Sequence, residues 1–162
     1  MAVIATDVEE IEHSILPRLQ SYLDLALCHH DLQNNNIIYD SATNTVSFID
    51  FDYSQVNYAL YDVVDHFGTY AGISNPDYSL YPSREEQRRF LRIYFDERGI
   101  KHFDEEKTLD ILKCISVLPH LSWFLWCLVQ ARISKIEFDY RKYAQVQLNM
   151  YFKLKSQLFC FI

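Results

Sequence analysis

Glycine and proline are scarce in this sequence, with three glycines and four prolines among 162 residues. Because both residues favour sharp turns, their scarcity indicates a helical body with few tight connections. The four cysteines lack a paired C-x-x-C spacing, and three of them stand in apolar surroundings. We therefore expect reduced, structural thiols rather than a disulfide framework. No repeat, low-complexity segment or linker interrupts the sequence, so residues 1–162 are expected to form a single domain.

Positive charge and long apolar runs are also in short supply. Asp and Glu outnumber Lys and Arg by 22 to 15, which gives a net charge of −7, and no basic stripe offsets it. This balance argues against nucleic acid as a partner. The most apolar stretch, residues 117–131, is shorter than a membrane span, and the acidic start MAVIATDVEE lacks the apolar run of a secretory signal. We therefore expect no membrane span and a cytoplasmic location.

Helical periodicity dominates most of the sequence. Apolar residues recur at three- and four-residue steps over residues 7–25, which predicts an amphipathic helix. The capping-box sequence SREE predicts that a second helix begins at Ser83 and continues to about residue 98, where Gly99 ends it. Two further stretches are predicted to be helical, residues 104–130 with a kink or break at Pro119, and residues 139–157.

Between the first two helices, the sequence predicts one β-hairpin. Two strand-like runs, residues 36–39 and 45–50, flank the turn-forming sequence SATN. Asp31 and Asn36 precede the hairpin, and Asp50 ends it. Because a hairpin brings its two ends together, we expect these three polar side chains to converge on one site. The expected fold is therefore mainly α-helical with one small β-hairpin.

These polar residues have the spacing of a phosphotransfer site. Asp31 can accept a hydroxyl proton, whereas Asn36 and Asp50 supply oxygen ligands for Mg²⁺ on a nucleoside triphosphate. Asp52 is a further candidate for a metal contact, since it shares a face with Asp50 in an extended strand. His29 is expected to hydrogen-bond the backbone near Asp50 and so support the site. Taken singly, each motif also fits a surface loop or an edge strand; together, in this order, they favour the catalytic interpretation.

Aromatic residues supply a second candidate feature. Trp123 and Trp126 are three residues apart on one predicted helix, and Tyr140 and Tyr143 repeat that spacing on the next. Such a stripe fits plain core packing, or a box for an organic cation, since aromatic faces attract ammonium groups. Beside a phosphotransfer site, the second interpretation predicts an amino-alcohol substrate. Its hydroxyl would face Asp31 and its cationic head the indoles.

The sequence resembles the C-terminal lobe of choline/ethanolamine kinases over residues 11–157. Six blocks in family order carry the resemblance: CHHDLQNNNIIYD, FIDFDYS, DHFGTYAG, DYSLYPSREEQ, WFLWCLVQARISKIEFDY and YAQVQLNMYFKLK. The resemblance implies a protein kinase-like fold and ATP- and Mg²⁺-dependent phosphorylation of ethanolamine or choline. That reaction is the first step of the CDP-amine route to phospholipids. Two stretches, YAGISNPDYSLYPSREEQ and IEFDYRKYAQ, look more like ethanolamine kinases, so the balance favours ethanolamine.

The resemblance also implies roles for individual residues. The family's catalytic Asp falls on Asp31, and Gln33 matches a Gln that choline kinases carry beside this base. The family's metal ligands fall on Asn36 and Asp50. Its aromatic cage falls on Trp123, Trp126 and Tyr143. Two pocket positions depart from the family, because Thr69 stands where it usually has Glu and Asp65 where it often has Asn. Val63-Val64 and Pro119 are also unexpected.

The larger departure lies upstream of the candidate base. Every glycine and every lysine follows Asp31, so no Gly-rich loop or strand lysine precedes it to grip the phosphates of ATP. We therefore expect a fragment or a shortened product that is the C-terminal lobe only, with the N-terminal lobe missing. The face left by that lobe should expose apolar surface and promote association, for example as a homodimer.

Three other functions fit parts of the pattern. A catalytically inactive amino-alcohol-binding or regulatory module that pairs with a full-length kinase would carry the same motifs. An aminoglycoside phosphotransferase-like enzyme shares the phosphotransfer motif, but the aromatic box on Trp123 and Trp126 argues against it. A protein kinase fits poorly, because Asp50-Phe51 is followed by Asp52 rather than Gly and no A-P-E sequence occurs.

Overall fold

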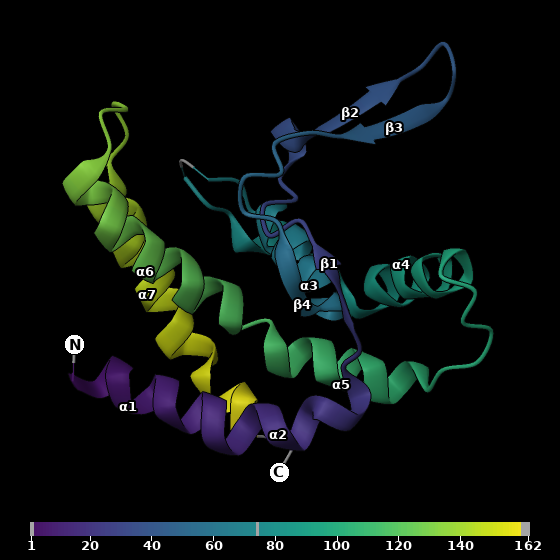
Figure 1. Cartoon of the computed structure of the whole chain (residues 1–162), viewed down its shortest axis with the longest axis horizontal. Helices are drawn as coiled ribbons and strands as arrows, with labels where there is room; N and C mark the ends of the chain where they lie inside the picture. The colour runs from purple at the N-terminus through teal and green to yellow at the C-terminus, as the bar shows by residue number, and fades with distance from the viewer. Residues whose placement is uncertain (1, 74, 160–162) are drawn as a thin grey trace.

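The computed structural model describes residues 2–73 and 75–159, and it begins with a long, interrupted helix (Figure 1). Its parts are α1 (Ala2–Glu10), a π-helical turn (Ile11–Ile15), α2 (Leu16–Leu19) and a 3₁₀ turn (Gln20–Tyr22). The prediction of one helix over residues 7–25 is therefore wrong at both ends. Ile4 is already buried, so the apolar face starts earlier, and Leu25 belongs to a strand. Pro17 lacks a backbone donor, which accounts for the change of helix type beside it.

Two small antiparallel sheets follow. β2 (Ile37–Asp40) pairs with β3 (Thr45–Phe48), which confirms the predicted hairpin. β1 (Leu25–Cys28) pairs with β4 (Gln55–Tyr58), and this sheet was not predicted. Two four-residue strands that pair across an intervening hairpin leave no local signal. The β2–β3 hairpin extends away from the helices, whereas β1 and β4 lie against α3 (Ala59–Thr69) (Figure 1).

Most of the remaining chain is helical. The longer helices are α4 (Arg84–Glu97), α5 (Glu105–Ile115), α6 (Leu118–Ile133) and α7 (Tyr140–Leu154), with 3₁₀ segments at Asn34–Asn36, Tyr78–Leu80 and Lys155–Phe159. The predicted capping box is present, because Ser83 Oγ accepts the backbone N–H of Glu86, whose carboxylate accepts the N–H of Ser83. Gly99, with φ of +74°, follows α4. Pro119 stands in the first turn of α6, at the predicted break.

α3 contributes several side chains to the hydrophobic core. Leu60, Val64 and Phe67 are at most 2% exposed, so the unexpected Val63-Val64 pair belongs to the core. On another side of the molecule, Asp7 of α1 is buried and accepts hydrogen bonds from the Tyr151 hydroxyl (2.9 Å) and from Lys155 Nζ. The first and last helical segments are therefore joined directly. Among the cysteines, Cys28 and Cys127 are buried free thiols, as predicted; Cys114 is also buried, and Cys160 lies outside the described residues.

By length and composition alone, the stretch that contains α5 and α6 is apolar enough to cross a membrane. An 18-residue window within Glu105–Ile133 has a mean hydropathy of 1.5, and 56% of that window is buried inside the protein. A core helix of a soluble protein passes the same test. The absence of a membrane span therefore stays a prediction.

Candidate active site

Asp31 lies in the loop after β1, where two neighbouring amides hold one of its oxygens. Its Oδ2 accepts hydrogen bonds from Gln33 Nε2 (3.2 Å) and Asn36 Nδ2 (2.9 Å), and Asn36 Nδ2 also donates to the backbone carbonyl of Asp31 (2.8 Å). Oδ1 accepts no hydrogen bond from the described part of the chain and so remains free for a substrate hydroxyl. Burial raises the pKa of Asp31; the two amide donors oppose this, and the charge of Asp50 adds to it.

The loop that carries Asp31 is anchored on α3 by a residue that the sequence did not reveal. Asp62 accepts the backbone N–H groups of His29 (2.6 Å) and His30 (2.9 Å), one on each carboxylate oxygen. His30 has φ of +67°, an unusual value for a residue other than glycine, so these bonds fix a strained turn. His30 also stacks on Tyr61 with ring centroids 4.6 Å apart, which packs the loop against α3.

His29 holds the two ends of the hairpin together, as predicted. Its Nε2 lies 2.9 Å from the carbonyl of Ile49, immediately before Asp50, and its ring packs on Phe51 with centroids 4.9 Å apart. The backbone N–H of Ile49 in turn donates to the carbonyl of Asn36 (3.0 Å). The structure therefore brings Asp50 close to the Asp31 loop, which the hairpin predicted. His29 itself supports the site from behind, since it does not line the cavity described below.

The segment after β3 is not the extended strand that the sequence suggested. β3 ends at Phe48, Asp50 has φ of +64°, and Ser54 N–H donates to the carbonyl of Phe51 (3.0 Å) to close a turn. Asp50 and Asp52 therefore do not share a strand face, and that part of the prediction is wrong. Asp50 lines the cavity and Asp52 does not, so Asp52 loses the argument that supported it as a metal contact.

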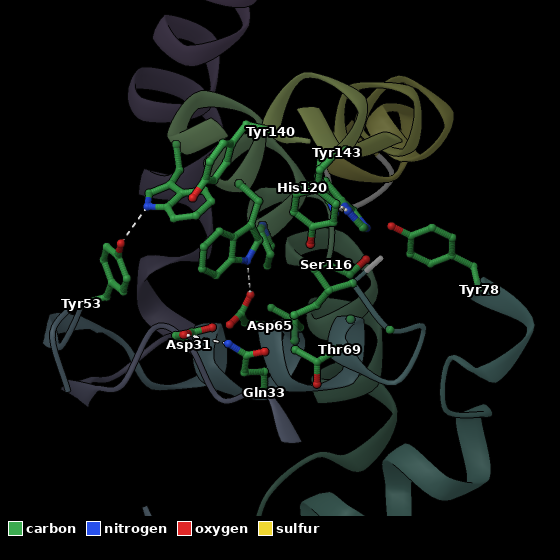
Figure 2. Close-up of a pocket in the computed structure, with 18 of the residues that line it drawn as sticks. Asp31, Gln33, Tyr53, Asp65, Thr69, Tyr78, Ser116, His120, Tyr140 and Tyr143 are labelled. Carbon is green, nitrogen blue, oxygen red and sulfur yellow. Dashed lines mark hydrogen bonds between the residues drawn. The ribbon is translucent and has the colours of Figure 1, made fainter. Parts of the chain in front are cut away.

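A cavity of about 390 Å³ adjoins Asp31 and extends between α3, α6 and α7. Figure 2 shows Asp31, Gln33, Asp65 and Thr69 along one side of it, and Tyr140, Tyr143 and His120 along the opposite side. All four predicted aromatic residues line this cavity, together with Asp31, Gln33 and Asp50. Asn36 does not line it, but its hydrogen bonds place it directly against Asp31. Two groups of residues that are distant in sequence, the acidic loop and the aromatic stripe, thus meet at one cavity.

The two indoles are held by polar partners that sequence reasoning missed. Trp126 Nε1 donates to the Tyr53 hydroxyl (2.9 Å), and Trp123 Nε1 donates to Asp65 Oδ1 (2.8 Å). The indole rings are nearly perpendicular, with centroids 5.3 Å apart and an interplanar angle of 84°. Since each N–H is already bonded, the indoles offer aromatic surface to a ligand. Among the signals available, only the departure from the family at Asp65 pointed to either partner.

Asp65 is the most deeply buried carboxylate of the cavity, at 2% exposure. Burial raises its pKa to about 7, while the Trp123 N–H opposes the rise and the charges of Asp31 and Asp62 increase it. Its second oxygen, Oδ2, is buried and has no hydrogen-bond partner among the described residues. Buried polar atoms in folded proteins are rarely left unpaired, so this oxygen requires an explanation.

The acidic end of the cavity suits magnesium better than a transition metal. Within residues 2–73 and 75–159, no three His, Cys, Asp or Glu side chains are grouped as they would be around a fully protein-bound ion. Mg²⁺ in nucleotide sites needs less, because one or two protein oxygens and the phosphates hold it. Asp50 supplies a carboxylate, and Asn36 keeps its amide oxygen free while its nitrogen serves Asp31. These two residues therefore fit such a cation.

Comparison with known proteins gives a consistent match. A family model described as choline/ethanolamine kinase matches residues 1–152. The chain is 43% identical to ethanolamine kinase 1 of Homo sapiens, in an alignment that covers 83% of this chain and 31% of that protein. It is 38% identical to ethanolamine kinase 2 of Mus musculus, over 94% of this chain and 41% of that protein. It is 33% identical to a probable choline kinase 3 of Arabidopsis thaliana, over 96% of this chain and 47% of that protein.

A solved structure shares the fold of almost the whole chain. The ethanolamine kinase of Plasmodium vivax superposes with a TM-score of 0.79 and 31% sequence identity, over 96% of this chain and 41% of that one. The chain thus spans less than half the length of each of these relatives.

Proposed function

Since this chain belongs to the choline/ethanolamine kinase family, we propose that it forms the acceptor-binding part of an enzyme that phosphorylates an amino-alcohol with Mg²⁺-ATP. Ethanolamine is favoured over choline, because relatives that are 38–43% identical to this chain are named ethanolamine kinases. The reaction would be the first step of the CDP-ethanolamine or CDP-choline route, in the cytoplasm. One observation carries the proposal: Asp31 keeps a free oxygen at the mouth of a cavity lined by aromatic side chains.

Each group has a chemical task in this proposal. The substrate hydroxyl oxygen attacks the γ-phosphorus of ATP, the bond from that phosphorus to the bridging oxygen breaks, and ADP leaves. Asp31 orients the hydroxyl and takes its proton, while Gln33 and Asn36 hold the carboxylate in place. Asp50 and Asn36 would hold Mg²⁺, which neutralises charge on the phosphates. Trp123, Trp126, Tyr140 and Tyr143 would surround the cationic head.

Phosphate transfer from Mg²⁺-ATP to ethanolamine and to choline tests this function directly. The assay compares this chain with its Asp31→Asn variant and with Glu97→Gln, which removes one exposed carboxylate on α4. Transfer that Asp31→Asn abolishes and Glu97→Gln preserves would support the proposal. Ethanolamine is expected to be the better acceptor. Equal transfer by the Asp31→Asn variant would refute the assigned base.

The positions of the glycines and lysines favour a second function. Every glycine and lysine follows Asp31, so groups that cradle ATP are not recognisable in this chain. The alternative is therefore an amino-alcohol-binding or regulatory module that is inactive by itself and pairs with a full-length kinase. Binding of ethanolamine without phosphate transfer, in the same preparation, would favour this module over the enzyme.

We also propose that the chain associates through the β1–β4 sheet. Leu25, Leu27 and Val56 are 65%, 75% and 68% exposed, and the pairing register places Val56 opposite Leu27. A row of exposed aliphatic side chains on a two-stranded sheet favours contact with another protein surface. Light scattering should detect dimers or larger species, and Leu27→Lys should shift them toward monomers. A monomer at every concentration tested would refute the association.

A further inference from the structure

Asp65 lines the aromatic cavity, and one of its carboxylate oxygens is unpaired. Oδ1 is occupied by the Trp123 N–H at 2.8 Å, and Oδ2 is buried without a partner in the described structure. A buried acceptor that loses its water and gains no donor destabilises the protein, and the effect is larger when the acceptor carries charge. This destabilisation disappears when a ligand supplies the missing donor. The unpaired oxygen therefore points to a bound group with an N–H or O–H.

The surroundings of Asp65 select the charge of that group. The ionisable groups that act on its carboxylate are Asp31 and Asp62, both acidic, and no described Lys, Arg or His forms an ion pair with it. Three carboxylates, those of Asp31, Asp50 and Asp65, border the cavity. The other walls are largely aromatic, so they contribute no compensating positive charge. A cationic donor satisfies both the unpaired oxygen and the excess of negative charge.

The opposite end of the ligand is fixed by Asp31. Asp31 and Asp65 line the same cavity, and the negative charge of Asp31 raises the pKa of Asp65. Thr69 follows one helical turn after Asp65 on α3 and also lines the cavity, but its hydroxyl donates to the carbonyl of His66 (2.7 Å). Of the α3 residues that line the cavity, only Asp65 can carry a charge, so it is the charged acceptor that α3 offers to a ligand whose hydroxyl lies at Asp31.

We propose that Asp65 accepts a hydrogen bond from the ammonium group of the substrate, and that it thereby selects a primary amine over a quaternary one. The proposal rests on the amino-alcohol function proposed above and deepens it. A primary ammonium has three N–H donors, so it can satisfy Asp65 Oδ2 while its charge faces the indoles. A trimethylammonium group has none, and it leaves Oδ2 buried and unpaired. Discrimination therefore arises from one carboxylate oxygen rather than from the aromatic walls, which attract both cations.

Binding measurements without nucleotide test this selection independently of catalysis. Isothermal titration calorimetry would compare ethanolamine, its N-methyl and N,N-dimethyl derivatives, and choline on the 162-residue chain. Affinity is expected to fall as methyl groups replace N–H donors. The indole N–H signal of Trp123 should shift on binding of ethanolamine, because that N–H shares the Asp65 carboxylate. Wild-type affinity that is equal for ethanolamine and choline, or the absence of ethanolamine binding, would overturn the proposal.

The Asp65→Asn variant separates this carboxylate from the rest of the site. Hydrogen bonds to charged groups contribute about 1.5–3 kcal/mol, which corresponds to roughly 10- to 100-fold in affinity for ethanolamine. Choline affinity should change far less, so the preference should vanish. Glu97→Gln is the charge-matched control and should retain the wild-type ranking. An unchanged preference in Asp65→Asn would refute the role of Asp65. Intact selection without phosphate transfer would instead contradict only the proposed enzyme function.

Discussion

Replacement of Asp65 by Asn should make the protein more stable at alkaline pH, while it weakens ligand binding. The carboxylate is 2% exposed, and burial raises its pKa from the ordinary 3.8 to about 7. A carboxyl group with a raised pKa in the folded state stabilises the fold below the unfolded pKa. That contribution is lost as the pH rises through the folded pKa. Above pH 7 the folded protein therefore holds a buried charge that the unfolded chain exposes to water.

The pKa values set the size of this effect. Each pKa unit corresponds to about 1.36 kcal/mol, so the difference between 3.8 and about 7 corresponds to about 4 kcal/mol at most. This is a large share of the roughly 5–15 kcal/mol by which domains are stable. Asn keeps an oxygen for the Trp123 N–H and does not ionise. It also places an amide N–H₂ where Oδ2 was, so the net gain should be about half of that limit.

Urea unfolding at pH 5 and pH 8 measures the effect. The free energy of unfolding of the wild type should fall by about 1.36 kcal/mol per pH unit up to the folded pKa. The difference in this free energy between Asp65→Asn and the wild type should therefore grow by up to about 3 kcal/mol between pH 5 and pH 8. With a slope of about 1–3 kcal/mol per molar urea, the midpoint at pH 8 should rise by about 1 M. Glu97→Gln should show no such pH dependence. An advantage that is absent at pH 8, or equal at both pH values, would refute the buried-charge argument.

Three further predictions concern the scaffold. Asp62→Ala should cost about 1–3 kcal/mol and loosen the Asp31 loop, because two backbone N–H groups lose their acceptor; hydrogen exchange at His29 and His30 would show it, and unchanged protection would contradict it. Ser83→Ala should lower the unfolding free energy by about 1 kcal/mol through loss of the α4 cap. Gly99→Ala should destabilise by about 1 kcal/mol, since an added Cβ meets nothing within 4 Å but φ is +74°. The matched Gly68→Ala, inside α3, should instead stabilise.

The parts of the fold that depend on neighbouring residues could be predicted from the sequence. The capping box at Ser83 and the turn between β2 and β3 are local chemistry, and both are present. The β1–β4 sheet was missed because its two four-residue strands are far apart in sequence and pair across the intervening hairpin, which leaves no local signal. α3 was missed as an element, although Leu60, Val63, Val64 and Phe67 recur at the three- and four-residue steps of an amphipathic helix.

In the candidate site too, contacts between residues that are near in sequence could be predicted, whereas contacts with distant elements could not. The spacing of Asp31 and Asn36 indicated a real contact, because a short loop limits how far apart the two side chains can be. Asp50 also came near this loop, but its left-handed backbone and the turn after it depend on how the chain packs on His29. The functions of Asp62 and Asp65 could not be predicted, because each depends on partners from distant elements. An acidic residue in a helix has no sequence mark that tells a buried acceptor from a solvated charge.

The contact between Asp7 and Tyr151 has a consequence for synthesis of the chain. These residues are 144 positions apart, so α1 gains this buried hydrogen-bond partner only after α7 has been synthesised. Until then the Asp7 carboxylate lacks both of its donors, the Tyr151 hydroxyl and the Lys155 ammonium group. Closure of this part of the core is thus coupled to the synthesis of α7. A nascent chain that stops before α7 would therefore leave the part of α1 around Asp7 accessible to chaperones and proteases.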